Sequence, residues 1–260
     1  MPPRTPPLPA DDPDLATLTL DELELRWSAA AARTAITAEA MTGADLKAQA
    51  LGTPGETLME QAGTAVAAAA RALVAFNGRE DKPVLILAGP GNNGGDGFVA
   101  ARVLAGWGTA VIAVLVAADE RPGTPDAIRN WKRLDRVDGV IRIHAPVARD
   151  VAILGQGIEK ASIVVDALLG TGVRGQLREP VRSAVEIIRK AREAGIPVLA
   201  VDTPTAVDLT SGDPSDPVVR ADLTVTFHRP KTGLRTRVGR ALAGRILVAP
   251  IGIPPEADRG

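Results

Sequence analysis

The feature that most constrains the fold is a repeated pattern of short apolar runs, each followed by a polar loop and a helical segment. The runs are 83–88 (PVLILA), 109–117 (TAVIAVLVA), 162–169 (SIVVDALL) and 197–202 (PVLAVD), with shorter ones at 140–143, 222–227 and 245–249. Continuous apolar runs of this length are typical of strands buried on both faces, and intervening helices imply right-handed crossovers. The sequence therefore predicts a Rossmann-like three-layer α/β/α sandwich with a mainly parallel sheet.

The organisation expected along the chain is one domain behind a tail. The 260 residues are enough for one sizeable core. The first 19 residues are rich in proline and acid, so we expect a disordered Pro-rich tail over 1–19 and a domain over 20–260. Helical patterns cover 20–33 and 56–76, and a third helix is expected to begin after Thr37, whose hydroxyl can cap it.

Composition excludes several classes of function. Thirty Lys and Arg against 31 Asp and Glu, with no basic block, argue against nucleic acid as a partner. The absence of cysteine removes disulfides and cysteine nucleophiles. The start of the chain lacks a signal-type apolar run, and no apolar stretch of about 18 residues could span a bilayer. We therefore expect a cytoplasmic protein that acts on a small molecule, with no membrane partner.

Three polar loops follow the apolar runs and mark the expected site. They are 89–97 (GPGNNGGDG), 166–176 (DALLGTGVRGQ) and 202–208 (DTPTAVD). In open parallel sheets ligands bind beyond the carboxyl ends of the strands, where loops lead into helix N-termini. Because all three loops fall at such ends, we expect them to converge on one ligand site.

The first loop has the composition of an anion-binding turn. Its glycines let the backbone approach a ligand, and the amides of the following helix favour a phosphate. It has neither the spacing of a Walker loop nor that of the dinucleotide fingerprint. The alternative is a plain strand-to-helix turn, but such a turn does not need Asn92, Asn93 and Asp96 beside so many glycines.

Two carboxylates end the other strands. Asp166 needs either a cation or a hydrogen-bonding ligand, or else it caps the neighbouring turn. Asp202 emerges from a buried strand and suits general acid or base work, with a satisfied loop cap as the alternative. Arg174 could contact a phosphate or be solvated, and Lys231 could reach a phosphate or be a plain surface lysine.

These segments together resemble a known family. LAGPGNNGGDGFVAARVL, VVDALLGTGVRG, VLAVDTPTAVDLTSGD and ADLTVTFHRPKTGL look like successive motifs of the NAD(P)H-hydrate epimerases, also called YjeF N-terminal domains. The segment ITAEAMTGADLKAQALGTPGETLMEQAG resembles that family's opening helices, so the likeness covers about 35–253. Family members interconvert the R and S forms of hydrated NADH and NADPH, and a separate dehydratase then repairs the S form.

The resemblance also implies the site. Asp202 would be the catalytic acid and base, and a potassium ion would lie near Asn93, Asp166 and Thr205. The substrate-binding residues that it implies are Asn92, Asn93, Gly94, Gly95, Asp96, Gly170, Thr171, Gly172, Val173, Arg174, Gly175, Gln176 and Asp202. Oxygen ligands of this kind suit a hard, weakly charged ion.

Two positions depart from the family pattern. Pro204-Thr205-Ala206 replaces the usual Pro-Ser-Gly, so the hydroxyl is kept but an alanine stands where a positive φ would favour glycine. Gln61 stands where an asparagine is usual. The chain has no room for a fused dehydratase, so we expect either a stand-alone epimerase or a piece of a longer protein.

Two alternative functions and a possible homodimer follow from the same sequence. A non-catalytic nucleotide-binding or scaffold module could use the same fold. An NAD-dependent dehydrogenase would need a GxGxxG motif with a downstream acid, and neither is visible. The apolar helix expected at 56–76 could serve a homodimer interface or the core equally well.

Overall fold

The computed structural model describes residues 6–170 and 176–258 and shows one sheet of seven strands within them. Every strand pair is parallel, and the strand order is β3-β2-β1-β4-β5-β6-β7. The strands are β1 (Val84–Ala88), β2 (Val111–Leu115), β3 (Val140–His144), β4 (Val164–Ala167), β5 (Val198–Val201), β6 (Leu223–Phe227) and β7 (Arg245–Ala249). This confirms the predicted parallel α/β sandwich, and all seven apolar runs are strands.

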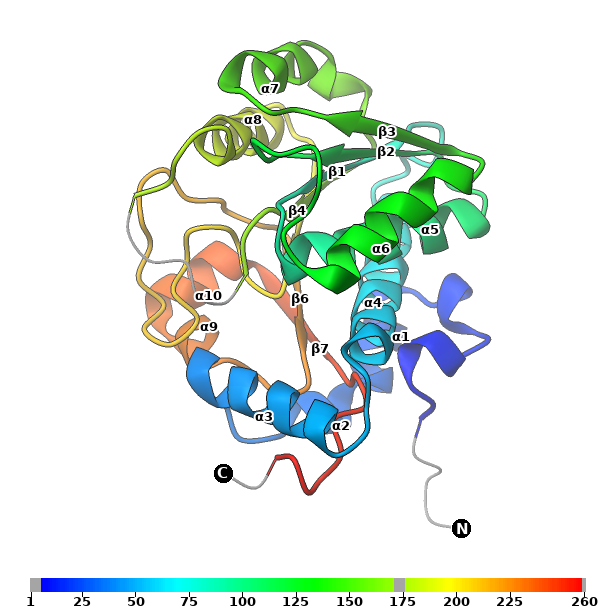
Figure 1. Ribbon diagram of the computed structural model, residues 1–260, viewed down its shortest axis with the longest axis vertical. Helices are drawn as coiled ribbons and strands as arrows, with labels where there is room; N and C mark the ends of the chain where they lie inside the picture. Colours follow the sequence, from blue (N-terminus) through cyan, green and yellow to red (C-terminus); the bar gives the residue numbers. More distant parts are fainter. Residues whose placement is uncertain (1–5, 171–175, 259–260) are drawn as a thin grey trace.

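Helices cover both faces of the sheet (Figure 1). They are α1 (Leu20–Arg26), α2 (Ser28–Ala31), α3 (Ala38–Ala50), α4 (Gly55–Phe76), α5 (Asn92–Gly106), α6 (Pro125–Arg133), α7 (Ala148–Leu154), α8 (Val181–Glu193), α9 (Thr232–Arg235) and α10 (Arg237–Ala243). One core cluster joins the sheet to α4 and α5, and a second joins the other face to α7 and α8. The three layers follow from strands that are apolar on both faces.

The helix α4 belongs to the core rather than to an exposed face. Its alanine-rich middle, from Ala62 to Ala70, is buried throughout. It packs closely on α5, where a Cβ at Gly63 would overlap the side chain of Val99. Small residues let two helices approach in this way, and the burial favours the core alternative over a dimer interface for this segment.

The strand order reverses between β1 and β4, and this reversal indicates where a ligand can bind. Strands β1, β2 and β3 run outward in one direction, and the chain then returns to place β4 on the other side of β1. The loops that leave β1 and β4 therefore diverge to opposite faces. Such a switch point opens a crevice at the carboxyl ends of the two strands.

The local signals read from the sequence have mixed outcomes. The Thr37 hydroxyl accepts a hydrogen bond from the backbone N–H of Ala40, so the predicted cap of α3 is confirmed. The helix expected over 20–33 is divided at Trp27, whose buried ring packs in the core. The short helices α7, α9 and α10 were not predicted, because segments of four to seven residues show too little periodicity.

The expectation of disorder over 1–19 is wrong for residues 6–19. Two short 3₁₀ helices form there, and Leu15 is buried against the core. Gln61 of α4 holds the segment from both ends of its amide, because Oε1 accepts from the Ala10 N–H at 2.7 Å and Nε2 donates to Asp11 Oδ2 at 3.2 Å. Asp12 also pairs with Arg26. One apolar anchor and these polar contacts order a segment whose composition alone suggested a tail.

No helix within the described residues is both long and apolar enough to cross a membrane.

Candidate functional site

The three polar loops meet at the carboxyl edge of the sheet, as predicted. Asp166 pairs in register with Leu87 of β1 on one side and Ala200 of β5 on the other, and Asp202 follows β5 directly. The loops leaving β1 and β4 touch, since the Gly89 N–H donates to the Ala167 carbonyl and a Cβ at Gly89 would overlap the Leu168 carbonyl oxygen. The site therefore lies at the switch point between β1 and β4.

The segment NNGGDG forms the first turns of α5 rather than a loop. The helix begins at Asn92, and Gly91 precedes it without a side-chain cap. Gly94 is required here, because a Cβ would overlap the carbonyl oxygen of Gly89. The first amides of α5 have no side-chain acceptor from Gly91, and such amides at a helix N-terminus favour an anion.

Asn93 points from this helix toward the second loop. It is buried, and its Oδ1 lies 3.1 Å from the position that a Cβ on Gly170 would take. Its Nδ2 has no hydrogen-bond partner among the described residues. A buried amide without a partner indicates a bound water, ion or ligand.

Asp166 is fully buried and is held by neutral donors. The backbone N–H of Thr205 donates to Oδ2 at 2.7 Å, the Thr205 hydroxyl donates to Oδ1 at 2.6 Å, and the Leu168 N–H donates to Oδ1 at 3.3 Å. Burial raises the pKa of Asp166 to about 6, against the opposing effect of these hydrogen bonds. The hydrogen-bonding partner that the sequence led us to expect for Asp166 is therefore Thr205 of the third loop. This contact joins the ends of β4 and β5.

Asp202 is held differently. The Thr226 hydroxyl donates to Oδ1 at 2.9 Å, and the Lys231 ammonium lies 3.1 Å from the same oxygen. The residue has φ of 62°, a conformation that is rare outside glycine and costs about 1 kcal/mol or more. A strained backbone that points a paired carboxylate into a ligand site is typical of functional positions.

Both readings of Lys231 made from the sequence are wrong. The side chain is fully buried, so it is not a surface lysine. Its Nζ contacts Asp202, the Thr226 hydroxyl at 2.8 Å and the Phe227 carbonyl at 2.9 Å, so its protons are taken up inside the protein rather than by a phosphate. A buried ammonium of this kind needs a carboxylate partner.

A third carboxyl group completes the electrostatics. Asp96 lies in the first turns of α5 and is partly buried. Burial, together with the negative charges of Asp202 and Asp45, raises the pKa of Asp96 well above its usual range. Burial and two neighbouring negative charges therefore disfavour the ionised form of Asp96.

The comparison with protein families agrees with this geometry. A family model described as YjeF-related protein N-terminus matches residues 55–233, which include all three loops. The chain belongs to this family.

Relatives within the YjeF-related family are close in sequence. The bifunctional NAD(P)H-hydrate repair enzyme Nnr of Methanothermobacter thermautotrophicus is 43% identical over 222 residues, covering 84% of this chain and 40% of that protein. The NAD(P)H-hydrate epimerase of Cenarchaeum symbiosum is 40% identical over 204 residues, covering 78% of this chain and 88% of that protein. The chain thus spans about two-fifths of the length of the bifunctional relatives it matches.

A solved structure shares the fold. The crystal structure of the yeast protein ynu0 (YNL200c) superposes with a TM-score of 0.66 at 27% sequence identity, over 77% of this chain and 83% of that one. The sandwich is therefore a shared architecture.

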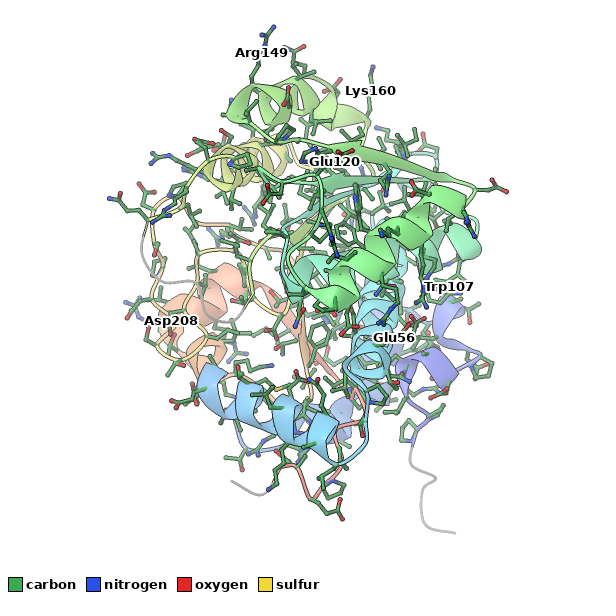
Figure 2. All side chains as sticks on the ribbon, viewed as in Figure 1. Glu56, Trp107, Glu120, Arg149, Lys160 and Asp208 are labelled. Atoms are coloured by element: carbon green, nitrogen blue, oxygen red, sulfur yellow. The ribbon has the colours of Figure 1, made fainter. Side chains whose placement is uncertain are left out.

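The departure from the family pattern in the third loop has a structural cost. Ala206 has φ of 75°, so the loop does require the left-handed conformation that glycine adopts freely. The loop keeps its shape through the hydrogen bonds from Ser215 N–H to the Ala206 carbonyl and from Val219 N–H to the Thr205 carbonyl. Asp208 ends this loop, away from the sheet, and Figure 2 shows it at the edge of the molecule.

Of the remaining predicted site residues, the structure describes Gly170 and Gln176. Gly170 lies against Asn93, whereas Gln176 is exposed. The predicted contacts Thr171, Gly172, Val173, Arg174 and Gly175 lie outside the described residues. The sequence missed Thr226 and the pairing of Lys231 with Asp202, although a threonine repeated in the apolar strand LTVTF was a signal that one side chain there has a polar partner.

Proposed function

We propose that this chain is an isomerase that interconverts the R and S forms of hydrated NADH and NADPH. The observation that carries the proposal is Asp202, an ion-paired carboxylate directly after β5, at the same carboxyl edge of the sheet where the NNGGDG turn follows β1. The proposal is supported by relatives named for this activity, among them the epimerases of Cenarchaeum symbiosum and Nitrosopumilus maritimus. The substrate would be a small anionic dinucleotide bound at the amides of α5.

The reaction needs a proton to reach one oxygen and leave another. The ring nitrogen of the hydrated nicotinamide expels the hydroxyl as water once its oxygen is protonated, which gives an iminium ion. Water then adds to either face of that ion and loses a proton. Asp202 is the group that we expect to move this proton, since its carboxylate is held at the strand end by Thr226 and Lys231.

Substrate binding is assigned to residues around the crevice. The first turns of α5 from Asn92 to Asp96, with Gly170 and Gln176, would hold the dinucleotide, and residues 171–175 would join them. The buried and unpartnered Nδ2 of Asn93 supports a polar ligand at this point. Enclosing the iminium in such a site would exclude competing reactions.

Potassium is proposed as the cofactor near Asn93, Asp166 and Thr205. The chemistry of these residues fits, because the Asp166 carboxylate, the Thr205 hydroxyl and the Asn93 amide each carry an oxygen that a hard cation can bind. The described residues contain no group of three or more His, Asp or Glu side chains that could hold a metal, so a single carboxylate favours a monovalent ion. Bound there, the ion would supply positive charge that fixes the loops and offsets the Asp166 carboxylate.

Partners follow from the chemistry of the product. An epimerase supplies the S hydrate to a dehydratase, either a separate enzyme or the remainder of a longer chain, as in the bifunctional relatives. The competing proposal, a non-catalytic binding module, is favoured only by the strained Ala206 in the third loop.

The direct test is to follow conversion of purified R-NADPH hydrate by chromatography in potassium buffer. Rapid approach to the equilibrium mixture by the wild type, with loss of about 100-fold or more in Asp202→Asn, is the expected result. A folded wild type that binds the hydrate without accelerating its conversion would make the chain a binding module.

A further inference from the structure

The residues that directly follow β5 and β6 share an unusual backbone conformation. Asp202 has φ of 62° and His228 has φ of 66°, both in the left-handed region that residues other than glycine rarely adopt. Such a conformation persists only where the surrounding structure holds it. Because β5 and β6 are paired neighbours, contacts beyond the strands must hold two adjacent strand ends.

Lys231 joins these two strand ends. Its ammonium lies 3.1 Å from Asp202 Oδ1, and it donates to the Phe227 carbonyl at 2.9 Å and to the Arg229 carbonyl at 3.4 Å. The side chain is fully buried, so water does not compete for these contacts. The position of the ammonium against Asp202 therefore depends on the segment 228–231, the β6 exit segment.

The backbone of the β6 exit segment is tied at its two ends. The His228 N–H donates to the Ala249 carbonyl at the end of β7, at 2.7 Å. The Ile36 N–H donates to the Pro230 carbonyl at 2.9 Å. These bonds fix where the segment starts and stops, so the side chains of His228 and Arg229 between them need contacts of their own.

Asp258, in the stretch that follows β7, supplies those contacts. Its Oδ1 accepts from Arg229 Nη1 at 3.0 Å and lies 3.0 Å from His228 Nε2. Its Oδ2 pairs with Arg33. The Asp258 side chain is only 8% exposed, and the preceding Ala257 is buried in the core. One anchored carboxylate thus contacts two consecutive residues of the β6 exit segment.

The charges around the β6 exit segment make the Asp258 carboxylate important. Burial and three nearby cations lower the pKa of His228 to about 3, so its ring is neutral at neutral pH. The cations are Arg33, Lys231 and Arg229. Asp258 is the carboxylate that both arginines contact. Without it, three positive groups would surround a neutral ring, and their mutual repulsion would oppose the present position of the segment.

We propose that Asp258 is a positioning residue for Asp202, acting through the β6 exit segment and the Lys231 ammonium. This inference rests on the proposed function, in which Asp202 moves the proton. The contacts are continuous, from Asp258 to Arg229, from the Arg229 carbonyl to Lys231, and from Lys231 to Asp202 Oδ1. A displacement of a reacting group by about 1 Å can lower a rate about 100-fold, so small shifts along these contacts bear on the chemical step.

The experiment measures kcat and KM for R-NADPH hydrate, together with backbone hydrogen exchange followed by mass spectrometry. Asp258→Asn keeps the size of the side chain and removes its charge. It is expected to lower kcat about 10-fold or more with little change in KM, and to speed exchange in peptides that cover 226–232. Asp258→Glu, which keeps the charge, should recover part of the kcat.

The chain offers a matched control in Asp12. Its side chain is 1% exposed and pairs with Arg26 at 2.8 Å, so Asp12→Asn also removes a buried carboxylate from an arginine pair, in the N-terminal segment. Asp12→Asn should leave both kcat and exchange over 226–232 unchanged. Urea unfolding of the two asparagine variants shows whether each is folded at the assay temperature.

A second variant tests the contact from the side of the β6 exit segment. Arg229→Gln removes the guanidinium that donates to Asp258, so it should reproduce the loss of kcat. Combined with Asp258→Asn it should lower kcat little further, because the two changes break the same contact. Arg229→Gln also covers the case in which Asp258→Asn does not fold.

Several results would overturn the role of Asp258. They are an unchanged kcat in folded Asp258→Asn, an equal loss in Asp12→Asn, and a change confined to KM. A lower kcat without faster exchange over 226–232 would show that the effect does not pass through the β6 exit segment. An inactive wild type would instead refute the proposed function, and the exchange comparison alone would then decide whether Asp258 holds the segment.

Discussion

The ends of β4 and β5 stabilise a buried carboxylate in two different ways. A buried aspartate lies at each strand end, Asp166 as the next-to-last residue of β4 and Asp202 directly after β5. Asp166 is surrounded by two N–H groups and a hydroxyl, all neutral. Asp202 faces the Lys231 ammonium, a full positive charge. Neighbouring positions on one sheet edge thus carry one carboxylate whose charge is matched by an ammonium and one whose hydrogen-bond donors are all neutral.

The difference teaches which carboxylate remains to be neutralised. The charge of Asp202 is already matched inside the protein, so this group can act on a proton without a bound cation. The charge of Asp166 is not matched by a described residue, and its pKa of about 6 shows that burial opposes ionisation. A cation is therefore expected to act on Asp166, and proton transfer to occur at Asp202.

The largest effect is expected from breaking the ion pair. Asp202→Ala leaves the buried Lys231 ammonium without a counter-ion, which should lower the free energy of unfolding by about 3–5 kcal/mol. Urea unfolding of Asp202→Ala, Lys231→Met and the double variant measures this. The double variant should recover part of the loss, because neither charge is then buried alone. Simple additivity of the two single losses would contradict a coupled pair.

The second effect is the part of the pH dependence of stability that comes from Asp166. Its folded pKa of about 6 exceeds the ordinary 3.8, so its contribution to stability is full below the unfolded pKa and is lost as pH rises through about 6. The loss should be on the order of a few kcal/mol. Subtracting the urea stability of Asp166→Asn from that of the wild type at each pH isolates it, and a flat difference would refute the assignment.

Potassium should act on the same group and in the opposite direction. Above about pH 6, where Asp166 ionises, potassium chloride is expected to raise the melting temperature of the wild type relative to a salt with a large organic cation at equal ionic strength. Asp166→Asn should lose this difference, whereas the exposed control Asp138→Asn should keep it. An equal response of the wild type and Asp166→Asn would exclude Asp166 as the cation ligand.

A smaller effect is expected at the contact that joins the two strand ends. Thr205→Val keeps the side-chain shape but removes the hydroxyl that donates to Asp166, so the free energy of unfolding should fall by about 1–3 kcal/mol. Thr205→Ser, which keeps the hydroxyl, is the matched control and should lose less. A loss in Thr205→Ser that equals or exceeds the loss in Thr205→Val would show that the methyl group contributes at least as much to stability as the hydroxyl.

The smallest effect is expected from relieving backbone strain. Ala206→Gly places glycine at φ of 75° and should raise the free energy of unfolding by about 1 kcal/mol or less, since glycine also gains entropy in the unfolded chain. The midpoint of urea unfolding measures it. A loss of stability would show that the alanine methyl group contributes more by packing than it costs by strain.

The sequence predicted the sheet well because buried parallel strands leave continuous apolar runs. It also placed the three loops, since each polar stretch directly follows such a run. It did not predict the burial of Lys231, because a single lysine after a strand carries no periodic signal. Nor did it predict the pairing of Asp202 with a residue 29 positions later, which depends on how the ends of β5 and β6 align.

The amide of Gln61 has an evolutionary consequence. It reaches both Ala10 and Asp11, and an asparagine at this place would be one methylene shorter. Residue 61 and the segment that it holds are therefore expected to vary together among related chains, so that a glutamine here and an ordered N-terminal segment are inherited as one trait.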